Sequence, residues 1–163
     1  MTSHADDAAS LPLDQLRAER DRLRNEEDAV SFVRRLAQGR IDLVEAVRHR
    51  KSSGESTAVA DIIRSGVGPA PSTGSARPPR DTEVAADHPL VAEFDDLCDR
   101  LGFDEMGDLD DSALTRLHDG LVSFEADQST RRRDLFERID ALTAELVRRY
   151  RDGDASVDSL LRG

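Results

Sequence analysis

The stretch EDAVSFVRRLAQGRID, residues 27–42, has a close counterpart in EADQSTRRRDLFERID, residues 125–140. The first copy has the spacing E-xxx-S-xx-R-xxx-Q-xxx-D, formed by Glu27, Ser31, Arg34, Gln38 and Asp42. The second copy keeps this spacing with phenylalanine in the glutamine position, and consists of Glu125, Ser129, Arg132, Phe136 and Asp140. In a helix that turns by about 100° per residue, five such positions fall within an arc of roughly 80° and span roughly 22 Å. Each copy therefore predicts a helix with a polar ladder on one face.

A seven-residue apolar repeat runs through both copies. Its members in the first copy are Leu16, Leu23, Val30, Ala37 and Val44, and in the second Leu114, Leu121, Gln128, Leu135 and Leu142. Glu27 and Glu125 are 98 residues apart, a multiple of seven, so the heptad phase is the same in both. This pattern indicates a duplicated helix. Polar residues interrupt the apolar seam at Arg20, Glu27, Arg34 and Gln128, which lowers its stability unless a ligand or partner fills the site.

The caps and breakers of the chain predict where its segments begin and end. Ser10 is a candidate N-cap with Pro12 in the first turn of the first long helix, and Asp108 or Asp110 can cap the second. The expected segments are a disordered tail at 1–9, a long helix at 10–52, a short helix at 55–66, a flexible Pro/Gly/Ser linker at 67–88, a second short helix at 89–102, a second long helix at 108–152 and a tail at 153–163.

The length of the first predicted helix decides the fold class. A helix of about 40 residues is roughly 60 Å long, too long to pack inside a compact domain of this size. A single amphipathic helix of that length is not stable alone, and the second long helix is its natural cover. The sequence therefore predicts an all-α fold in which two long helices form a coiled coil, with short connecting helices and a disordered linker.

The composition limits the classes of partner. A formal charge of -11 argues against direct DNA binding, which needs a basic face, and suits a basic protein partner. Cys98 is the only cysteine, so no intrachain disulfide can form, and no apolar run is long enough to cross a bilayer. We therefore expect a cytoplasmic protein with no membrane partner. The four histidines show no ligand spacing with one another or with Cys98, so we expect no metal site.

The chemistry of the ladder suits guanine nucleotides. The planar fork of arginine matches the O6 and N7 acceptors of guanine and pairs with phosphate. Glutamate and aspartate can accept hydrogen bonds from the guanine N1 and N2 donors, and a serine hydroxyl can donate to a phosphate oxygen. Hydrolysis is disfavoured because no nucleophile with a histidine base is present, so we do not expect an enzyme.

The doubled spacing resembles the cyclic di-GMP signature of the RsiG family, actinobacterial anti-sigma factors that hold the sporulation sigma factor WhiG. The resemblance covers both long helices, and the first copy matches at all five positions. It implies that the two helices are antiparallel, that they bind a partly intercalated dimer of cyclic di-GMP, and that the ligand enables binding of a WhiG-type sigma factor. The implied contacts are the ten ladder residues, with Phe136 as the departure: it either stacks on a base or has joined the apolar seam.

Two other functions remain open from the sequence. A ladder of charges can simply solvate a helix, which predicts a ligand-independent coiled-coil adaptor. A nucleotide phosphodiesterase is the more remote alternative, since no metal-ligand cluster accompanies the ladder. Four further arginines either supplement the site or, as we expect, pair with acids on their own helix: Arg35, Arg40, Arg133 and Arg138.

Overall fold

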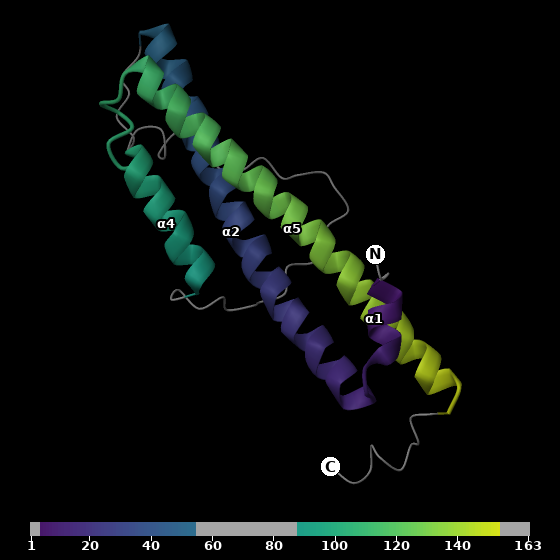
Figure 1. The fold of residues 1–163 in the computed structure, drawn as a ribbon. Helices are drawn as coiled ribbons and strands as arrows, with labels where there is room; N and C mark the ends of the chain where they lie inside the picture. Colours follow the sequence, from purple (N-terminus) through teal and green to yellow (C-terminus); the bar gives the residue numbers. More distant parts are fainter. Residues whose placement is uncertain (1–3, 55–87, 154–163) are drawn as a thin grey trace. The chain divides into compact units, whose positions relative to one another are not determined.

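The computed structural model of the chain describes residues 4–54 and 88–153. Four helices occupy these ranges: α1 (His4–Ser10), α2 (Leu13–Ser53), α4 (Pro89–Leu101) and α5 (Asp111–Arg151). The described residues contain no strand, which confirms the all-α prediction for them (Figure 1). The predicted short helix at 55–66, and the linker and tail apart from His88 and Gly153, lie outside the described residues.

The chain divides into two compact units. Unit 1 comprises Met1–Asp28 and Thr130–Gly163, and unit 2 comprises Ala29–Ser129. The long helices α2 and α5 each contribute residues to both units, whereas α1 belongs to unit 1 and α4 to unit 2.

The predicted heptad residues form the core of both units. Nine of the ten are apolar, and each of these is no more than 6% exposed. Their burial removes apolar surface from water, which is the main term that stabilises a pair of long helices.

Unit 2 gains a third helix, α4, which lies beside α2 and α5 (Figure 1). The rings of Phe94 on α4 and Phe124 on α5 lie 5.0 Å apart between centroids. On α2, the guanidinium of Arg40 lies 4.6 Å from the centroid of Phe94 and bonds Asp95 at 3.0 Å. Cys98 is buried beside them, and burial raises the pKa of its thiol.

The ends of α4 and α5 follow from local sequence. His88 Nδ1 accepts a hydrogen bond from the backbone N–H of Leu90 at 3.2 Å, and Pro89 starts α4. Gly102 ends α4 in the left-handed region at φ 73°, which glycine adopts without a steric cost. Asp110 caps α5 by accepting from the N–H of Ala113 at 2.7 Å, so of the two predicted caps Asp110 is the one used.

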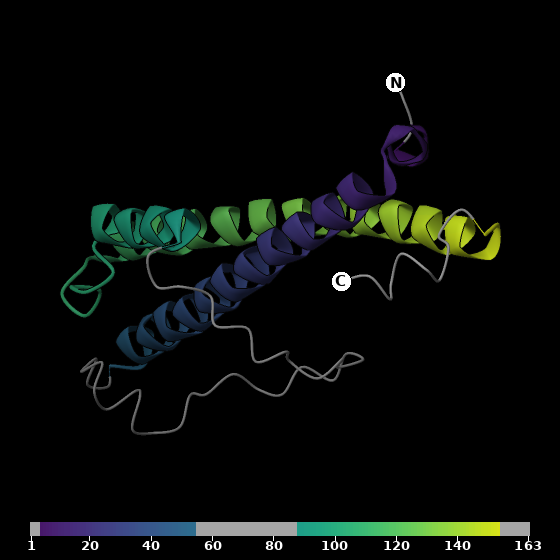
Figure 2. The same cartoon turned by 90° about the horizontal axis from the view of Figure 1, so that it is seen from below.

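The expectation of a disordered tail at 1–9 is wrong for the described part of that range. Residues from His4 onward form α1, which Figure 2 shows next to the beginning of α2. Ser10 is the last residue of α1 and its hydroxyl donates to the carbonyl of Asp7, so it does not cap α2, which starts at Leu13. Contacts within unit 1 explain why these residues are helical. Arg149 donates to the carbonyl of Ala9 at 2.9 Å, and the neighbouring Ala8 is buried.

Within each unit, the contacts between α2 and α5 follow a consistent order. In unit 2, α5 residues 118 and 125 contact α2 residues 45 and 34 respectively. In unit 1, α5 residues 132, 138 and 150 contact α2 residues 27, 19 and 17 respectively. Residue numbers therefore fall along α5 as they rise along α2 in either unit.

Candidate functional site

The two ladders are divided between the two units. Glu27 belongs to unit 1, and the other four residues of the first ladder belong to unit 2. In the second ladder, Glu125 and Ser129 belong to unit 2 and the other three residues to unit 1. Each unit therefore holds residues from both ladders.

In unit 2, a single carboxylate oxygen gathers three donors. Glu125 Oε1 accepts from Arg34 Nη1 at 3.2 Å, from Gln38 Nε2 at 3.1 Å and from Ser129 Oγ at 2.9 Å. The side chains of Arg34 and Glu125 are 24% and 21% exposed, so this ion pair is only partly screened by water. Four of the predicted residues thus form one polar cluster.

In unit 1, the same two residue types meet with the helices exchanged. Arg132 Nε on α5 donates to Glu27 Oε1 on α2 at 2.9 Å. The guanidinium of Arg132 also lies 4.6 Å from the ring centroid of Phe136, at a distance typical of a cation–π contact. Phe136 is half-buried and orients the arginine, a contact that neither sequence interpretation of this residue included.

The two ion pairs are related by the duplication. Adding the 98-residue offset to Arg34 gives Arg132, and subtracting it from Glu125 gives Glu27. Each arginine therefore pairs with the glutamate of the other ladder, on the other helix. Two surface ladders that merely solvated their own helices would not need this reciprocal pairing.

Two predicted residues, Asp42 and Asp140, stand apart from these clusters. Ser31 and Asp42 are half-buried, and Asp140 is exposed. Among the residues that the structure describes, neither Asp42 nor Asp140 makes a hydrogen bond or ion pair with another ladder residue. Their assignment to the site still depends on the spacing alone.

Gln128 is a residue that the ladder spacing does not include. It is 7% exposed, and its Oε1 atom has no hydrogen-bond partner. The buried Nε atom of Arg34 is likewise unpartnered. Leaving a buried polar atom unpaired costs on the order of 1–3 kcal/mol. The sequence signal was available, because Gln128 is the one polar member of the heptad repeat.

Further ion pairs surround the clusters and correct one prediction. Arg40 pairs with Asp95 on α4, and Arg138 on α5 pairs with Glu19 on α2 at 3.2 Å. Both pairs join different helices, so the expected pairing within one helix is wrong for these two arginines. Their acidic partners lay too far away in sequence for helical spacing to reveal them.

The acids of unit 1 near the ladder are held ionised. Hydrogen bonding to Arg22 lowers the pKa of Glu19, with a smaller contribution from the charge of Arg138. Burial acts to raise the pKa of Glu26, but its ion pairs with Arg131 and Arg22 outweigh burial and lower it. These carboxylates therefore stay negative at neutral pH and compensate the arginines.

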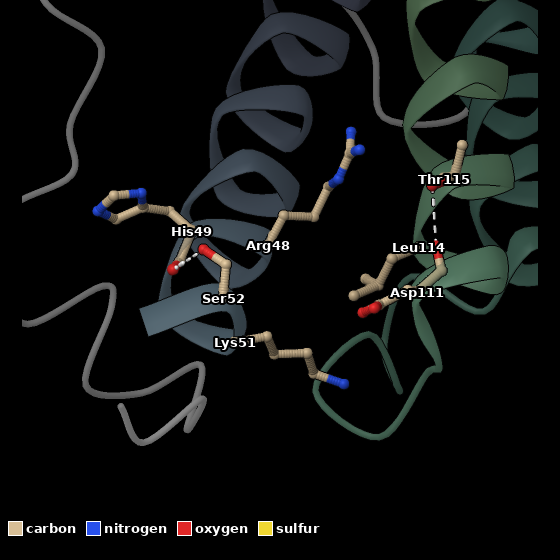
Figure 3. Close-up of a pocket in the computed structure, with 7 residues that line it drawn as sticks. All are labelled: Arg48, His49, Lys51, Ser52, Asp111, Leu114 and Thr115. Atoms are coloured by element: carbon tan, nitrogen blue, oxygen red, sulfur yellow. Dashed lines mark hydrogen bonds between the residues drawn. The ribbon is translucent and has the colours of Figure 1, made fainter. Parts of the chain in front are cut away.

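A cavity of about 440 Å³ lies elsewhere in unit 2, between the end of α2 and the start of α5 (Figure 3). It contains no ladder residue and is lined by Arg48, His49, Lys51, Ser52, Asp111, Leu114 and Thr115. The ammonium group of Lys51 contacts the carbonyl of Leu109. Cations at the carboxyl end of a helix stabilise its dipole, which is a sufficient reason for this basic group.

Two features are absent from the described ranges. No three His, Cys, Asp or Glu side chains within 4–54 and 88–153 are grouped closely enough to hold a metal ion. None of the four described helices combines the length and apolar character needed to cross a bilayer.

Comparison with known protein families gives a match over most of the chain. The family described as RsiG-like matches residues 2–65 and 102–163, which include both long helices and both ladders. No curated protein matches the sequence.

Proposed function

The chain belongs to the RsiG-like family, which indicates an anti-sigma factor role, and we propose that it binds cyclic di-GMP and then sequesters a WhiG-type sigma factor from RNA polymerase. The family is one of regulatory proteins and is not known for enzymes. The proposal adds to this role a ligand, a named class of partner and a coupling between the two.

The proposed scaffold is an antiparallel coiled coil of α2 and α5. Its support is the order of the contacts in each unit, where α5 numbers fall as α2 numbers rise. In antiparallel helices the arginine of one motif copy faces the glutamate of the other, as in the two observed ion pairs, whereas parallel helices in the same register would set like residues beside each other. Such a scaffold gives each unit one set of these groups.

The reciprocal ion pairs, Arg34 with Glu125 and Arg132 with Glu27, carry the proposal. A guanine can engage both partners of such a pair. The guanidinium can donate to guanine O6 and N7, while the carboxylate accepts from N1 and N2. Ser31 and Ser129 can donate to phosphate oxygens, and the remaining ladder residues complete the two half-sites. The family resemblance implies that the ligand is a dimer of cyclic di-GMP.

The sigma factor follows from family membership and charge. A chain with a formal charge of -11 is suited to a partner with a basic face, and a sigma factor must bind promoter DNA. Occupying that basic face would keep the sigma factor from transcription. We place the protein in the cytoplasm, where its ligand and partner are found.

Isothermal titration calorimetry with cyclic di-GMP tests the ligand. Arg34→Ala and Arg132→Ala should each abolish measurable binding, because each removes the guanine-matching fork from one half-site. Their helix content should stay close to that of the wild type, since neither arginine is one of the buried apolar residues that form the core. Arg116→Ala is the matched control: Arg116 is an exposed arginine of α5 that bonds Ser112, and its loss should leave nucleotide binding normal.

A ligand-independent coiled-coil adaptor is the second candidate, and the same ion pairs favour it. Paired charges can hold two helices together without any ligand, with modest stabilisation when partly exposed. This alternative predicts that the wild type gives no heat with cyclic di-GMP. Unchanged affinity in both arginine variants would instead refute the assignment of the site while keeping the ligand.

A further inference from the structure

Gln128 lies in the core of unit 2 at a position where the heptad pattern calls for an apolar residue. The equivalent position on α2, after the 98-residue offset, is Val30, which is fully buried. Gln128 is itself more than nine-tenths buried, and its Oε1 atom accepts no hydrogen bond. A leucine here would avoid the cost of burying an unpaired acceptor.

A structural role explains such residues only when they are paired. A buried amide in a coiled coil can specify register by bonding a polar partner across the seam. The oxygen of Gln128 has no such partner, so register gives no account of it. A ligand that donates a hydrogen bond to this oxygen would account for it.

The unpaired oxygen accompanies an unpaired donor. Arg34 Nε, in the same unit, is also buried without a partner, although Nη1 of that arginine bonds Glu125. Glu125 lies three residues before Gln128, hence one turn away on the same helix. The unsatisfied groups thus adjoin the ion pair proposed to read guanine.

The half-site built on Glu125 and the half-site built on Glu27 differ at two positions. Two carboxamide side chains accompany Glu125. Gln38 donates a hydrogen bond to it, and Gln128 lies three residues further along α5. The positions equivalent to them in the other copy hold Phe136 and Val30. One half-site therefore has extra hydrogen-bonding capacity where the other is apolar.

We propose that Gln128 is a further ligand-binding residue of the Glu125 half-site, whose buried carboxamide oxygen accepts a hydrogen bond from bound guanine nucleotide. This inference rests on the proposed binding of cyclic di-GMP. It adds a residue outside the ladder and makes the two half-sites unequal.

The decisive variant is Gln128→Met, which keeps the length of the side chain and removes its polar atoms. Without nucleotide, its melting temperature should equal or exceed that of the wild type, because an unpaired acceptor leaves the core. Its dissociation constant for cyclic di-GMP should rise by about 10-fold or more, the usual scale for a lost buried hydrogen bond. Stability and affinity should thus change in opposite directions.

Gln128→Glu separates direct contact from an indirect effect. This variant retains an acceptor oxygen, so its affinity should stay within about 3-fold of wild type even if its melting temperature falls. Gln15→Met, at an exposed position of α2, is the control for the substitution itself.

Two results would show that Gln128 does not contact the ligand. One is equal weakening of nucleotide binding by Gln128→Met and Gln128→Glu, and the other is wild-type affinity in Gln128→Met. A wild type that failed to bind would instead overturn the proposed function together with this inference.

Discussion

Glu145, near the end of α5, accepts hydrogen bonds from two arginines one turn further along. Arg148 donates at 2.7 Å and Arg149 at 2.6 Å to its Oε1 atom. These bonds lower the pKa of Glu145 from its ordinary value near 4.5 to about 2. Arg149 also donates to the carbonyls of Ala9 and Leu11, so the carboxylate helps to fix the residue that holds α1 in place.

This pKa predicts how the stability of unit 1 depends on pH. The carboxylate of Glu145 is more acidic in the folded chain than in the unfolded chain. Its contribution to stability is therefore complete above the pKa of the unfolded chain, near 4.5, and is lost as pH falls toward 2. Wild type should therefore be more stable than Glu145→Gln at pH 6, and the difference should shrink below about pH 4.5. Urea unfolding of both proteins at several pH values measures this difference in stability.

The control for this titration is Glu137→Gln, since Glu137 is an exposed glutamate of α5 that makes no ion pair in the described part of the chain. A stability difference between wild type and Glu145→Gln that stayed constant from pH 6 to pH 2 would contradict the prediction.

At the scale of residues, the spacing identifies the polar residues of the two ladders but not how they pair. The spacing predicts Arg34, Gln38, Glu125 and Ser129 as site residues, and the structure joins these four side chains in one cluster. The spacing could not show that each arginine pairs with the opposite ladder, because spacing along one helix contains no information about the facing helix. The spacing offers no reason to place Phe136 against Arg132 rather than against a base or the apolar seam.

At the scale of elements, two glycines inside long helices offer a matched pair. A Cβ atom added at Gly39 of α2 would meet nothing within 4 Å. At Gly120 of α5 it would lie 2.6 Å from Cδ1 of Leu101, the last residue of α4. Gly120 therefore permits the close approach of α4, whereas Gly39 has no such packing role.

The two alanine substitutions should differ in sign or size. Gly39→Ala should raise the free energy of unfolding by about 1 kcal/mol, since glycine is unfavourable inside a helix. The free energy of unfolding of Gly120→Ala should be lower than that of Gly39→Ala by about 1 kcal/mol or more, because Leu101 must move or change rotamer. Urea unfolding followed by circular dichroism, without nucleotide, gives both values.

Adding Leu101→Ala tests the cause of this difference. In that background Gly120→Ala should recover the gain seen at Gly39, and the coupling should appear as non-additivity in a double-mutant cycle. Additive effects would show that the contact with Leu101 is not what limits Gly120.

The elements that could be predicted from sequence are those that repeat. Both long helices carry a heptad pattern over many turns, and the observed bounds differ from those expected by at most three residues at each end. Helix α1 is only seven residues long and depends on Arg149, a residue more than 130 positions away. No local pattern can reveal a helix that is stabilised mainly by such a distant contact.

At the scale of the whole molecule, the proposal requires that nucleotide and sigma factor strengthen each other's binding. Linkage makes the two effects equal: the factor by which cyclic di-GMP raises affinity for the sigma factor must match the converse factor. Couplings of this kind are typically about 5- to 150-fold. Titrating nucleotide into the protein alone and into its complex with a WhiG-type sigma factor measures one side, and sigma titrations with and without nucleotide measure the other.

Arg34→Ala gives the control for this coupling. It should remove the effect of nucleotide on sigma binding while leaving the affinity measured without nucleotide unchanged. Equal sigma affinity with and without saturating cyclic di-GMP, in wild type, would mean that the two partners bind independently.

The chain has one tyrosine and no tryptophan, and this places a natural optical reporter in a known position. Arg17 Nε on α2 donates to the hydroxyl of Tyr150 on α5 at 3.0 Å, entirely within unit 1. Intrinsic fluorescence of the protein therefore comes from Tyr150 and follows the separation of α2 from α5 at that one point. Far-ultraviolet dichroism averages over every helix. If the tyrosine emission changes at a lower temperature than the helical dichroism signal, the first melting step lies in unit 1.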